Sequence, residues 1–165
     1  MAFQKTIGLY NAPATVGDRA SQNPTVYFPT NFLAGGTVKV GGFVWRDSTN
    51  GEKEVVATGT GKPLGFIERT INHPLDTVAV EGTLDIPEGG NVTVAMRGDF
   101  YVKADASVAV GATVYAVLAT GAVTFTAGSG NTVDTGYKAL TSGASGDMVI
   151  ISNLMQTEIP ASAAE

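Results

Sequence analysis

The chain has 165 residues, of which 44% are hydrophobic and 15% charged, with a net charge of −5 and no cysteine. An acidic chain with scattered lysines and arginines lacks the clustered positive charge that nucleic acids and anionic membranes require. The absence of cysteine excludes disulfides, thiolate metal sites and cysteine nucleophiles, and no apolar run reaches the roughly 18 residues of a spanning helix.

Low charge and 21 glycines also indicate the kind of fold and surface. Small and β-branched residues between frequent glycines are typical of short strands joined by tight turns. A fully solvated monomer normally carries more charge than this chain does. The composition therefore favours a β-protein whose surface is partly covered by other protein.

Residues 1–36 are predicted to be an extended, irregular N-terminal arm, because prolines at 13, 24 and 29 interrupt them. Large apolar residues are nevertheless spread along this segment and need a surface to bury them. The segment either folds over its own barrel or docks onto a neighbouring subunit or another protein. The candidate contact residues are Phe3, Ile7, Tyr10, Tyr27, Phe28 and Phe32.

Two stretches, starting at Val38 and Val108, share the pattern V-x-V-G-x-x-V followed by an aromatic residue. Both copies continue with a tight turn, a short apolar strand, a glycine-rich loop and a further strand. In the two copies these elements occupy 50–51, 54–57, 58–61 and 64–67, and 120–121, 122–125, 127–130 and 135–138. Alternating apolar residues predict strands, and the asparagine-glycine pair of the first turn predicts a hairpin.

The rest of the chain also reads as strands and turns. Residues 71–90 interrupt the repeated pattern and are predicted to be an insertion. Residues 91–103 predict two strands with a turn at Gly98, and 147–151 predict an apolar final strand. Residues 154–165 end in one proline followed by small residues, which is typical of a C-terminal tail.

These elements amount to about ten short strands and no helix, which predicts an all-β fold. We expect a small antiparallel β-barrel or sandwich over 37–153, built from two similar hairpin units and preceded by the arm.

Catalytic chemistry has little support in the sequence. The single histidine, His73, stands in a turn before a proline, without the G-x-S-x-G elbow of a serine hydrolase. The Gly59–Lys62 stretch lacks the features of a phosphate loop, because Val56 and Pro63 occupy the positions of its first glycine and its hydroxyl. We predict no catalytic residue, no metal site and no cofactor. One histidine per subunit on an oligomer axis is the one metal arrangement left open.

Two further patterns carry little weight. Carboxylate pairs such as Glu52 and Glu54 are expected at solvated strand edges, where charge discourages wrong pairing. Arg97-Gly98-Asp99 spells an adhesion tripeptide, but a glycine-aspartate pair is ordinary turn chemistry at that place.

The second half of the chain contains a series of short motifs in a characteristic order. They are Ala109 to Tyr115, Ala119 to Thr124, Gly130 to Thr132, Gly136 to Leu140 and Gly146 to Ile151. Their order and spacing resemble the C-terminal half of tailed-phage capsid cement, or head decoration, proteins, and 63–66 and 91–98 resemble the central part. The resemblance covers about 37–152, and the N-terminal segment and 71–90 depart from the family pattern.

The resemblance implies a non-enzymatic protein of the virion, made in the host cytoplasm and bound in many copies to the outer surface of an icosahedral head. Its implied partners are the major capsid protein, whose subunits it would bridge, and further copies of itself. A homotrimer is favoured and a dimer is possible. Two other readings stay open, namely another phage structural β-module, such as a tail, fibre or surface component, and a small hydrolase with a carboxylate pair.

Overall fold

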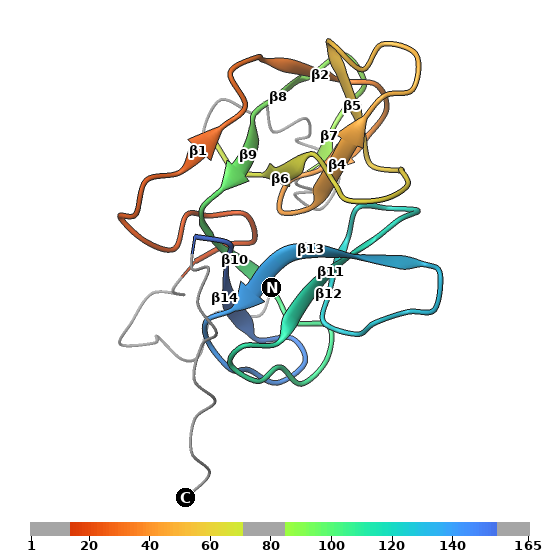
Figure 1. Ribbon diagram of the computed structural model, residues 1–165. Helices are drawn as coiled ribbons and strands as arrows, with labels where there is room; N and C mark the ends of the chain where they lie inside the picture. The colour runs from red at the N-terminus through yellow and green to blue at the C-terminus, as the bar shows by residue number, and fades with distance from the viewer. Residues whose placement is uncertain (1–13, 71–84, 155–165) are drawn as a thin grey trace, which may run out of the picture.

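The computed structural model describes residues 14–70 and 85–154, which form 14 strands in three sheets and contain no helix (Figure 1). In chain order the strands are β1 (Val26–Tyr27), β2 (Phe32–Ala34), β3 (Val38–Lys39), β4 (Phe43–Arg46), β5 (Glu54–Val56), β6 (Gly65–Ile67), β7 (Asp85–Ile86), β8 (Asn91–Val92), β9 (Val94–Arg97), β10 (Asp99–Lys103), β11 (Thr113–Val117), β12 (Val123–Thr124), β13 (Thr132–Ala139) and β14 (Met148–Ser152). Their pairing is antiparallel except between β2 and β5. The predicted all-β fold is confirmed.

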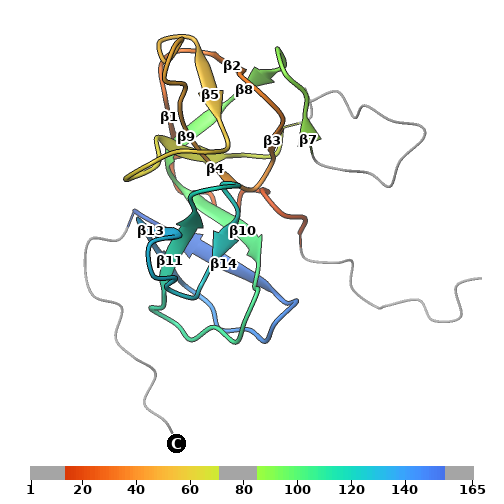
Figure 2. The same cartoon turned by 90° about the vertical axis from the view of Figure 1, so that its right-hand side faces the viewer.

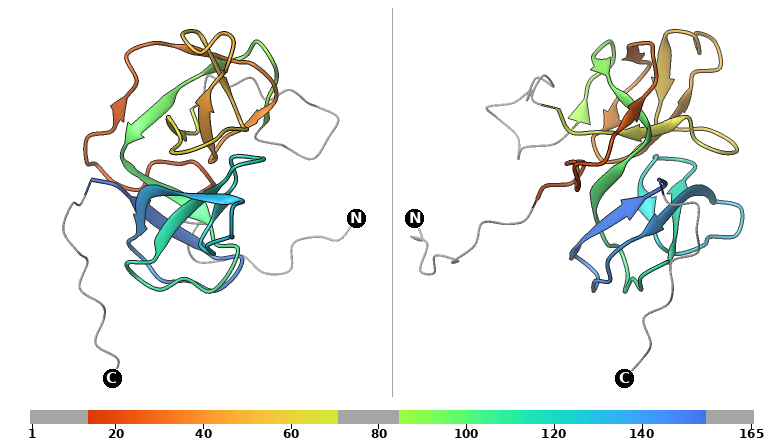
Figure 3. Two further views of the ribbon diagram at one scale, coloured as in Figure 1. Left: turned by 45° about the vertical axis from the view of Figure 1, so that its right-hand side comes forward. Right: turned by 60° about the vertical axis from the view of Figure 1, so that its left-hand side comes forward.

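The strands gather into two lobes stacked one on the other (Figures 1 and 2). The first lobe contains a seven-stranded sheet of order β1-β9-β6-β4-β5-β2-β8, which curves into a nearly closed barrel, and the short β3–β7 pair. The second lobe contains a five-stranded sheet of order β10-β14-β13-β11-β12. Figure 3 shows the same two lobes from further sides.

The chain passes from the first lobe to the second through β9 and β10, with only Gly98 between them. The sequence predicted a turn that would fold these strands back on each other. Instead β9 pairs with β1 and β6, whereas β10 pairs with β14 in the other sheet. Gly98 therefore lies at the crossing between lobes.

The predicted repeat is present as two five-stranded units with one topology. The first unit has the strand order β1-β9-β6-β4-β5 and the second has β10-β14-β13-β11-β12. In chain order, the first to fifth strands of both units take the same places. The first lobe then adds β2, β3, β7 and β8, which have no counterpart in the second.

The repeated glycine makes the same hydrogen bonds in both units. The N–H group of Gly41 donates to the Ile67 carbonyl in β6, and that of Gly111 donates to the Ala139 carbonyl in β13, each over 2.8 Å. The N–H groups of Ile67 and Ala139 each donate back, over 2.9 Å, to the residue that follows the glycine. The sequence pattern V-x-V-G thus marks one backbone junction used twice.

The sequence alignment of β6 with β13 is off by one residue. It pairs Ile67 with Lys138, whereas the hydrogen bonds make Ala139 the counterpart of Ile67. The cause is a bulge in β13, where the stretch 134–138 faces only 113–115 of β11.

The sheet of the first unit is buried on both faces. Val44, Ile67 and Val94 face the interior of the first lobe, whereas Phe43 and Phe66 face the second lobe. This explains why β4 and β6 are apolar without alternation, as strands covered on both sides are.

Four aromatic rings, from Phe43, Phe66, Phe100 and Tyr137, form the centre of the core between the lobes. Phe66 of the first lobe stacks on Phe100 of the second with ring centroids 4.6 Å apart, and Phe43 meets Tyr137 edge-on at 5.5 Å. Such pairs add about 0.5–1.5 kcal/mol each to the burial of their area. The lobes are therefore joined by a shared apolar core.

Backbone hydrogen bonds join the two lobes around this core, along a line that we call the seam. The Phe43 N–H donates to the carbonyl of Gly121 over 2.7 Å, and the Gly59 N–H donates to that of Leu118 over 3.0 Å. Residues 17–20, which we call the seam segment, run along β10 and are paired with it through three further backbone hydrogen bonds of 2.8–2.9 Å.

The described part of the predicted arm is integrated in the fold. Residues 14–36 contain the seam segment and the strands β1 and β2, which pair with β9, β5 and β8. Of the predicted insertion at 71–90, residues 85–86 form β7 and pair with β3. The other residues of these two segments, 1–13 and 71–84, and the tail from 155 lie outside the described residues.

Candidate functional site

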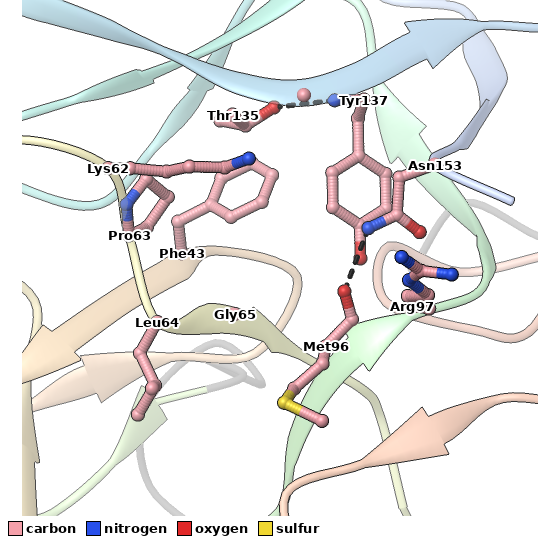
Figure 4. A pocket seen from close by; sticks show the side chains of 11 residues that line it. Phe43, Lys62, Pro63, Leu64, Gly65, Met96, Arg97, Thr135, Tyr137 and Asn153 are labelled. Atoms are coloured by element: carbon pink, nitrogen blue, oxygen red, sulfur yellow. Dashed lines mark hydrogen bonds between the residues drawn. The ribbon is translucent and has the colours of Figure 1, made fainter. Parts of the chain in front are cut away.

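A cleft of about 510 Å³ opens between the lobes beside the aromatic core (Figure 4). Its first-lobe wall comes from β4, the loop before β6, and the end of β9, and its second-lobe wall from β13 and the residue after β14. It is lined by Phe43, Lys62, Pro63, Leu64, Gly65, Met96, Arg97, Thr135, Gly136, Tyr137 and Asn153.

The loop that carries Lys62 is held in place by Trp45. The indole Nε1 of Trp45 donates to the carbonyl of Gly61 over 2.8 Å. The ring also packs so tightly on Gly59 that an added Cβ would lie 2.2 Å from it. Packing against Trp45 therefore explains the glycine-rich stretch, which fixes Lys62 at the cleft.

The bulge of β13 shapes the opposite wall. The Thr135 hydroxyl donates to the Val114 carbonyl over 2.8 Å and accepts the Tyr137 N–H over 3.2 Å. The Gly136 N–H donates to Asp134 Oδ1 over 2.8 Å. These bonds turn Gly136 outward and the Tyr137 ring inward.

Tyr137 is 2% exposed, yet its hydroxyl has no hydrogen-bond partner among the described residues. Asn153 lies beside it in Figure 4, but its amide donates to the Met96 carbonyl over 2.8 Å and its oxygen accepts the Gly98 N–H over 3.0 Å. Burial raises the pKa of Tyr137 well above its ordinary value, the Asp99 carboxylate adds to this shift, and the neighbouring Asn153 amide opposes it. The hydroxyl therefore stays protonated and has a proton to donate.

The charged groups of the cleft are both positive. Lys62 and Arg97 are exposed, and neither makes an ion pair with another described residue. No described acidic residue lines the cleft. This local positive charge stands out on a chain with a net charge of −5.

A second polar cluster lies at the seam and is satisfied internally. Arg19 Nη2 donates to Tyr27 Oη over 2.5 Å and to Glu68 Oε1 over 3.3 Å, and the Tyr27 hydroxyl donates to the other Glu68 oxygen. Burial raises the pKa of Tyr27, and the hydrogen bond and charge of Glu68 raise it further. The cluster ties the seam segment to β1 and to the end of β6, which is a structural role.

The predicted contact residues fall into two groups. Phe32 is fully buried in the first lobe, Phe28 packs on it with ring centroids 5.2 Å apart, and Tyr27 belongs to the seam cluster. Arg46 lies over both phenylalanine rings, at 5.0 and 5.5 Å. These side chains contribute to the chain's own fold. Phe3, Ile7 and Tyr10 lie outside the described residues.

The histidine and the adhesion tripeptide singled out in the sequence do not form a catalytic or metal site within the described residues. These residues contain no group of three or more side chains that could hold a metal ion, and His73 lies outside them. Asp99 of the adhesion tripeptide is 3% exposed and accepts hydrogen bonds from Ser21 and Asn23, so it is not displayed. In the part of the chain that is described, no helix has the length and apolarity to cross a membrane.

The sequence pattern of the XM1 gp53 minor capsid protein family matches residues 3–153. The chain belongs to this family. As a member of the XM1 gp53 minor capsid protein family it is a phage capsid-related structural protein, and neither the family nor the similar structures are enzymes. The resemblance to a capsid-associated phage family is thereby confirmed.

A solved structure agrees with the family assignment in fold. A chain in the capsid of Myoviridae phage XM1 has a TM-score of 0.65 at 17% identity, over 93% of this chain and 98% of that one. A chain of the head fiber gp8.5 N base of bacteriophage phi29 has a TM-score of 0.46 at 16% identity, over 83% of this chain and 99% of that one. No curated protein sequence matches the chain.

Sequence reasoning did not find the cleft of this gp53-family chain. Lys62 had been considered as part of a rejected phosphate loop and Arg97 as part of an adhesion tripeptide, but neither as a binding residue. The signal that points to the cleft is the repeat itself, because Gly65 and Gly136 stand at matched places in the two copies and both line it. Arg97 and Asn153 come from outside the repeated stretches, and no pattern links them.

Proposed function

We propose that this chain is a decoration protein that lies on the outer surface of a phage head and bridges major capsid protein subunits. The observation that carries the proposal is the match of residues 3–153 to a minor capsid protein family. The charged fraction of 15% supports it, since low charge suits a surface covered in part by other protein.

Symmetry would make such binding strong without a single strong site. A protein bound in many copies gains from modest contacts repeated around the head, because linked contacts raise the apparent affinity. We propose that the copies assemble as a homotrimer on a local symmetry axis, with a dimer as the second possibility. The trimer would present three identical surfaces to the capsid subunits below it.

Within the predicted arm, we assign the capsid or neighbour contact to the part that includes Phe3, Ile7 and Tyr10. Tyr27, Phe28 and Phe32 already contact their own lobe, so removing them would unfold the first sheet. A clean test therefore deletes only residues 2–13. We expect this variant to keep the β-sheet circular dichroism spectrum of the full chain and to bind heads less tightly. Unchanged affinity would contradict the assignment.

The proposal as a whole is tested by co-sedimentation of the purified chain with heads of its source phage that lack it. We expect saturable pelleting at a fixed ratio to the major capsid protein, and that ratio constrains the oligomer. Absence of pelleting by the folded chain would overturn the decoration role and direct attention to a tail or surface partner.

A further inference from the structure

We propose that the cleft between the lobes binds an extended, carboxylate-bearing peptide segment of a neighbouring protein in the phage head. The identity of the neighbour rests on the proposed function. The chemistry of the ligand rests on the cleft itself, through its charge, its buried hydroxyl and its walls.

The charge of the cleft selects an anion. Lys62 and Arg97 are free of ion pairs with described residues and are seen on opposite sides of the Tyr137 ring in Figure 4. The planar guanidinium of Arg97 matches the two oxygens of a carboxylate, and the ammonium of Lys62 adds a second positive charge from the other wall. Two acidic side chains stand close to lining residues in the sequence. Asp134 accepts the N–H of Gly136. Asp99, whose charge acts on the Tyr137 hydroxyl, accepts hydrogen bonds from Ser21 and Asn23.

The Tyr137 hydroxyl supplies an independent sign of a missing partner. Buried polar groups are nearly always hydrogen-bonded, and one left unpaired lowers the stability of the fold. This hydroxyl is buried without an acceptor in the described residues, while Asn153 beside it is bonded to Met96 and Gly98. A carboxylate oxygen that entered between Arg97 and Asn153 would accept its proton.

The walls of the cleft suit an extended chain better than a nucleic acid. Gly136 presents exposed backbone on the second-lobe wall, whereas Gly65 on the opposite wall is buried against Ala95 and Val94 of β9. Gly136 also leaves room for Lys62, whose Nζ would lie 3.1 Å from a Cβ added there. Two cations are too few to track a phosphate backbone, which requires a cluster of them.

The solution test uses a fluorescein-labelled peptide of alternating glutamate and serine, with a glutamine–serine peptide as the neutral probe. We expect fluorescence anisotropy to show saturable, salt-sensitive binding of the acidic peptide only. The Lys62→Glu, Arg97→Glu variant should bind at least about tenfold more weakly, since it loses two charge-assisted contacts and gains two repulsive charges. The Lys53→Glu, Lys103→Glu variant has the same net charge and alters exposed lysines away from the cleft, and should bind like the original chain.

Failure of the acidic peptide to bind the original chain, or equal binding by both variants, would overturn the proposal. The chain's own C-terminal segment is another possible source of a carboxylate, and a chain truncated after Leu154 tests it. If the peptide binds only after this truncation, the ligand is the chain's own C-terminal segment, which contains Glu158 and Glu165, and a neighbouring protein is excluded.

Head binding by the same two variants distinguishes this inference from the proposed function. We expect the cleft variant to pellet poorly with heads and the control variant to pellet normally. If both pellet normally, the decoration role stands and the cleft proposal fails. If the original chain does not pellet either, the decoration role fails, and the peptide measurement alone decides what the cleft binds.

Discussion

The two five-stranded units of this chain share a topology but not an environment. In the first unit, β4 and β6 lie between two apolar cores and are buried on both faces. In the second unit, β11 and β13 alternate between buried and more exposed residues, because one face packs on the core between the lobes and the other faces outward. The comparison teaches that strand pairing is set by the repeated turns and glycines, whereas burial is set by what each sheet packs against.

The largest expected effect follows from breaking the core that the units share. Phe66→Ala removes the ring that contacts Phe43, Phe100 and Tyr137, and should cost about 3–5 kcal/mol of unfolding free energy. Because these rings join the lobes, we expect the original chain to unfold in one transition and the Phe66→Ala variant to unfold in two. Calorimetry and urea unfolding measure both effects.

The matched control for this change is Val55→Ala, which opens a cavity inside the first lobe only. It should lower the unfolding free energy while one transition remains. A single transition in Phe66→Ala, with stability near that of the original chain, would contradict a core shared by the lobes.

The next largest effect tests the backbone contact between the units. Gly121 has a φ of 68°, and a Cβ added there would lie 2.1 Å from the carbonyl oxygen of Phe43. Gly121→Ala should cost at least about 2 kcal/mol, since the positive φ alone costs roughly 1 kcal/mol and the clash adds to it. Chemical denaturation measures the difference.

Gly130→Ala is the control, because Gly130 has a φ of 78° but nothing within 4 Å of an added Cβ. It isolates the cost of the backbone conformation. Equal losses in the two variants would mean that the contact between Gly121 and β4 contributes nothing.

A smaller, pH-dependent effect is expected at Asp99, where the chain enters the second unit. Burial would raise the pKa of Asp99, but hydrogen bonds with Ser152, Ser21 and Asn23 outweigh it and hold the pKa below its ordinary value. A depressed folded-state pKa contributes stability above the unfolded value of about 3.9, and this stability is lost as the pH falls through the folded value.

Asp99→Asn should therefore cost about 1–3 kcal/mol at neutral pH. Its stability should also fall less than that of the original chain when the pH is lowered below about 4. Urea unfolding at a series of pH values measures this difference. Parallel pH profiles for the two proteins would rule out a role for the Asp99 charge.

The smallest effect is expected at the surface of the seam. Arg69 and Asp18 form an exposed ion pair of 2.9 Å, and Arg69→Ala should cost no more than about 1 kcal/mol, with less effect at high salt. Thermal unfolding at two salt concentrations provides the measurement. A large, salt-independent loss would show that the backbone bond from the Arg69 N–H to Gly17 had also been disturbed.

The sequence predicted the elements better than their assembly. The V-x-V-G pattern and the Asn50 and Gly121 turns identified the repeated unit, because local backbone chemistry determines such turns. Gly98 was misread, since a glycine-aspartate pair suits both a turn and the passage between lobes. The register of β13 was missed by one residue because a bulge leaves no distinct pattern.

The candidate site was less predictable than the strands, because it depends on how the two units assemble. Gly65 and Gly136 stand at matched places in the two sequence copies, but the cleft exists only because the units pack against each other with Tyr137 between them. Phe32 illustrates the converse error. An apolar residue in an irregular segment suggests an external surface, whereas here the chain's own β5 and β8 provide the surface that buries it.

The most direct test of the decoration role is an electron cryomicroscopy difference map between heads with and without this protein. We predict added density on the outer surface, at junctions between major capsid protein subunits, into which the two-lobed fold fits in several symmetry-related copies. Density inside the head, on the tail alone, or over single capsid subunits without bridging them would contradict the account.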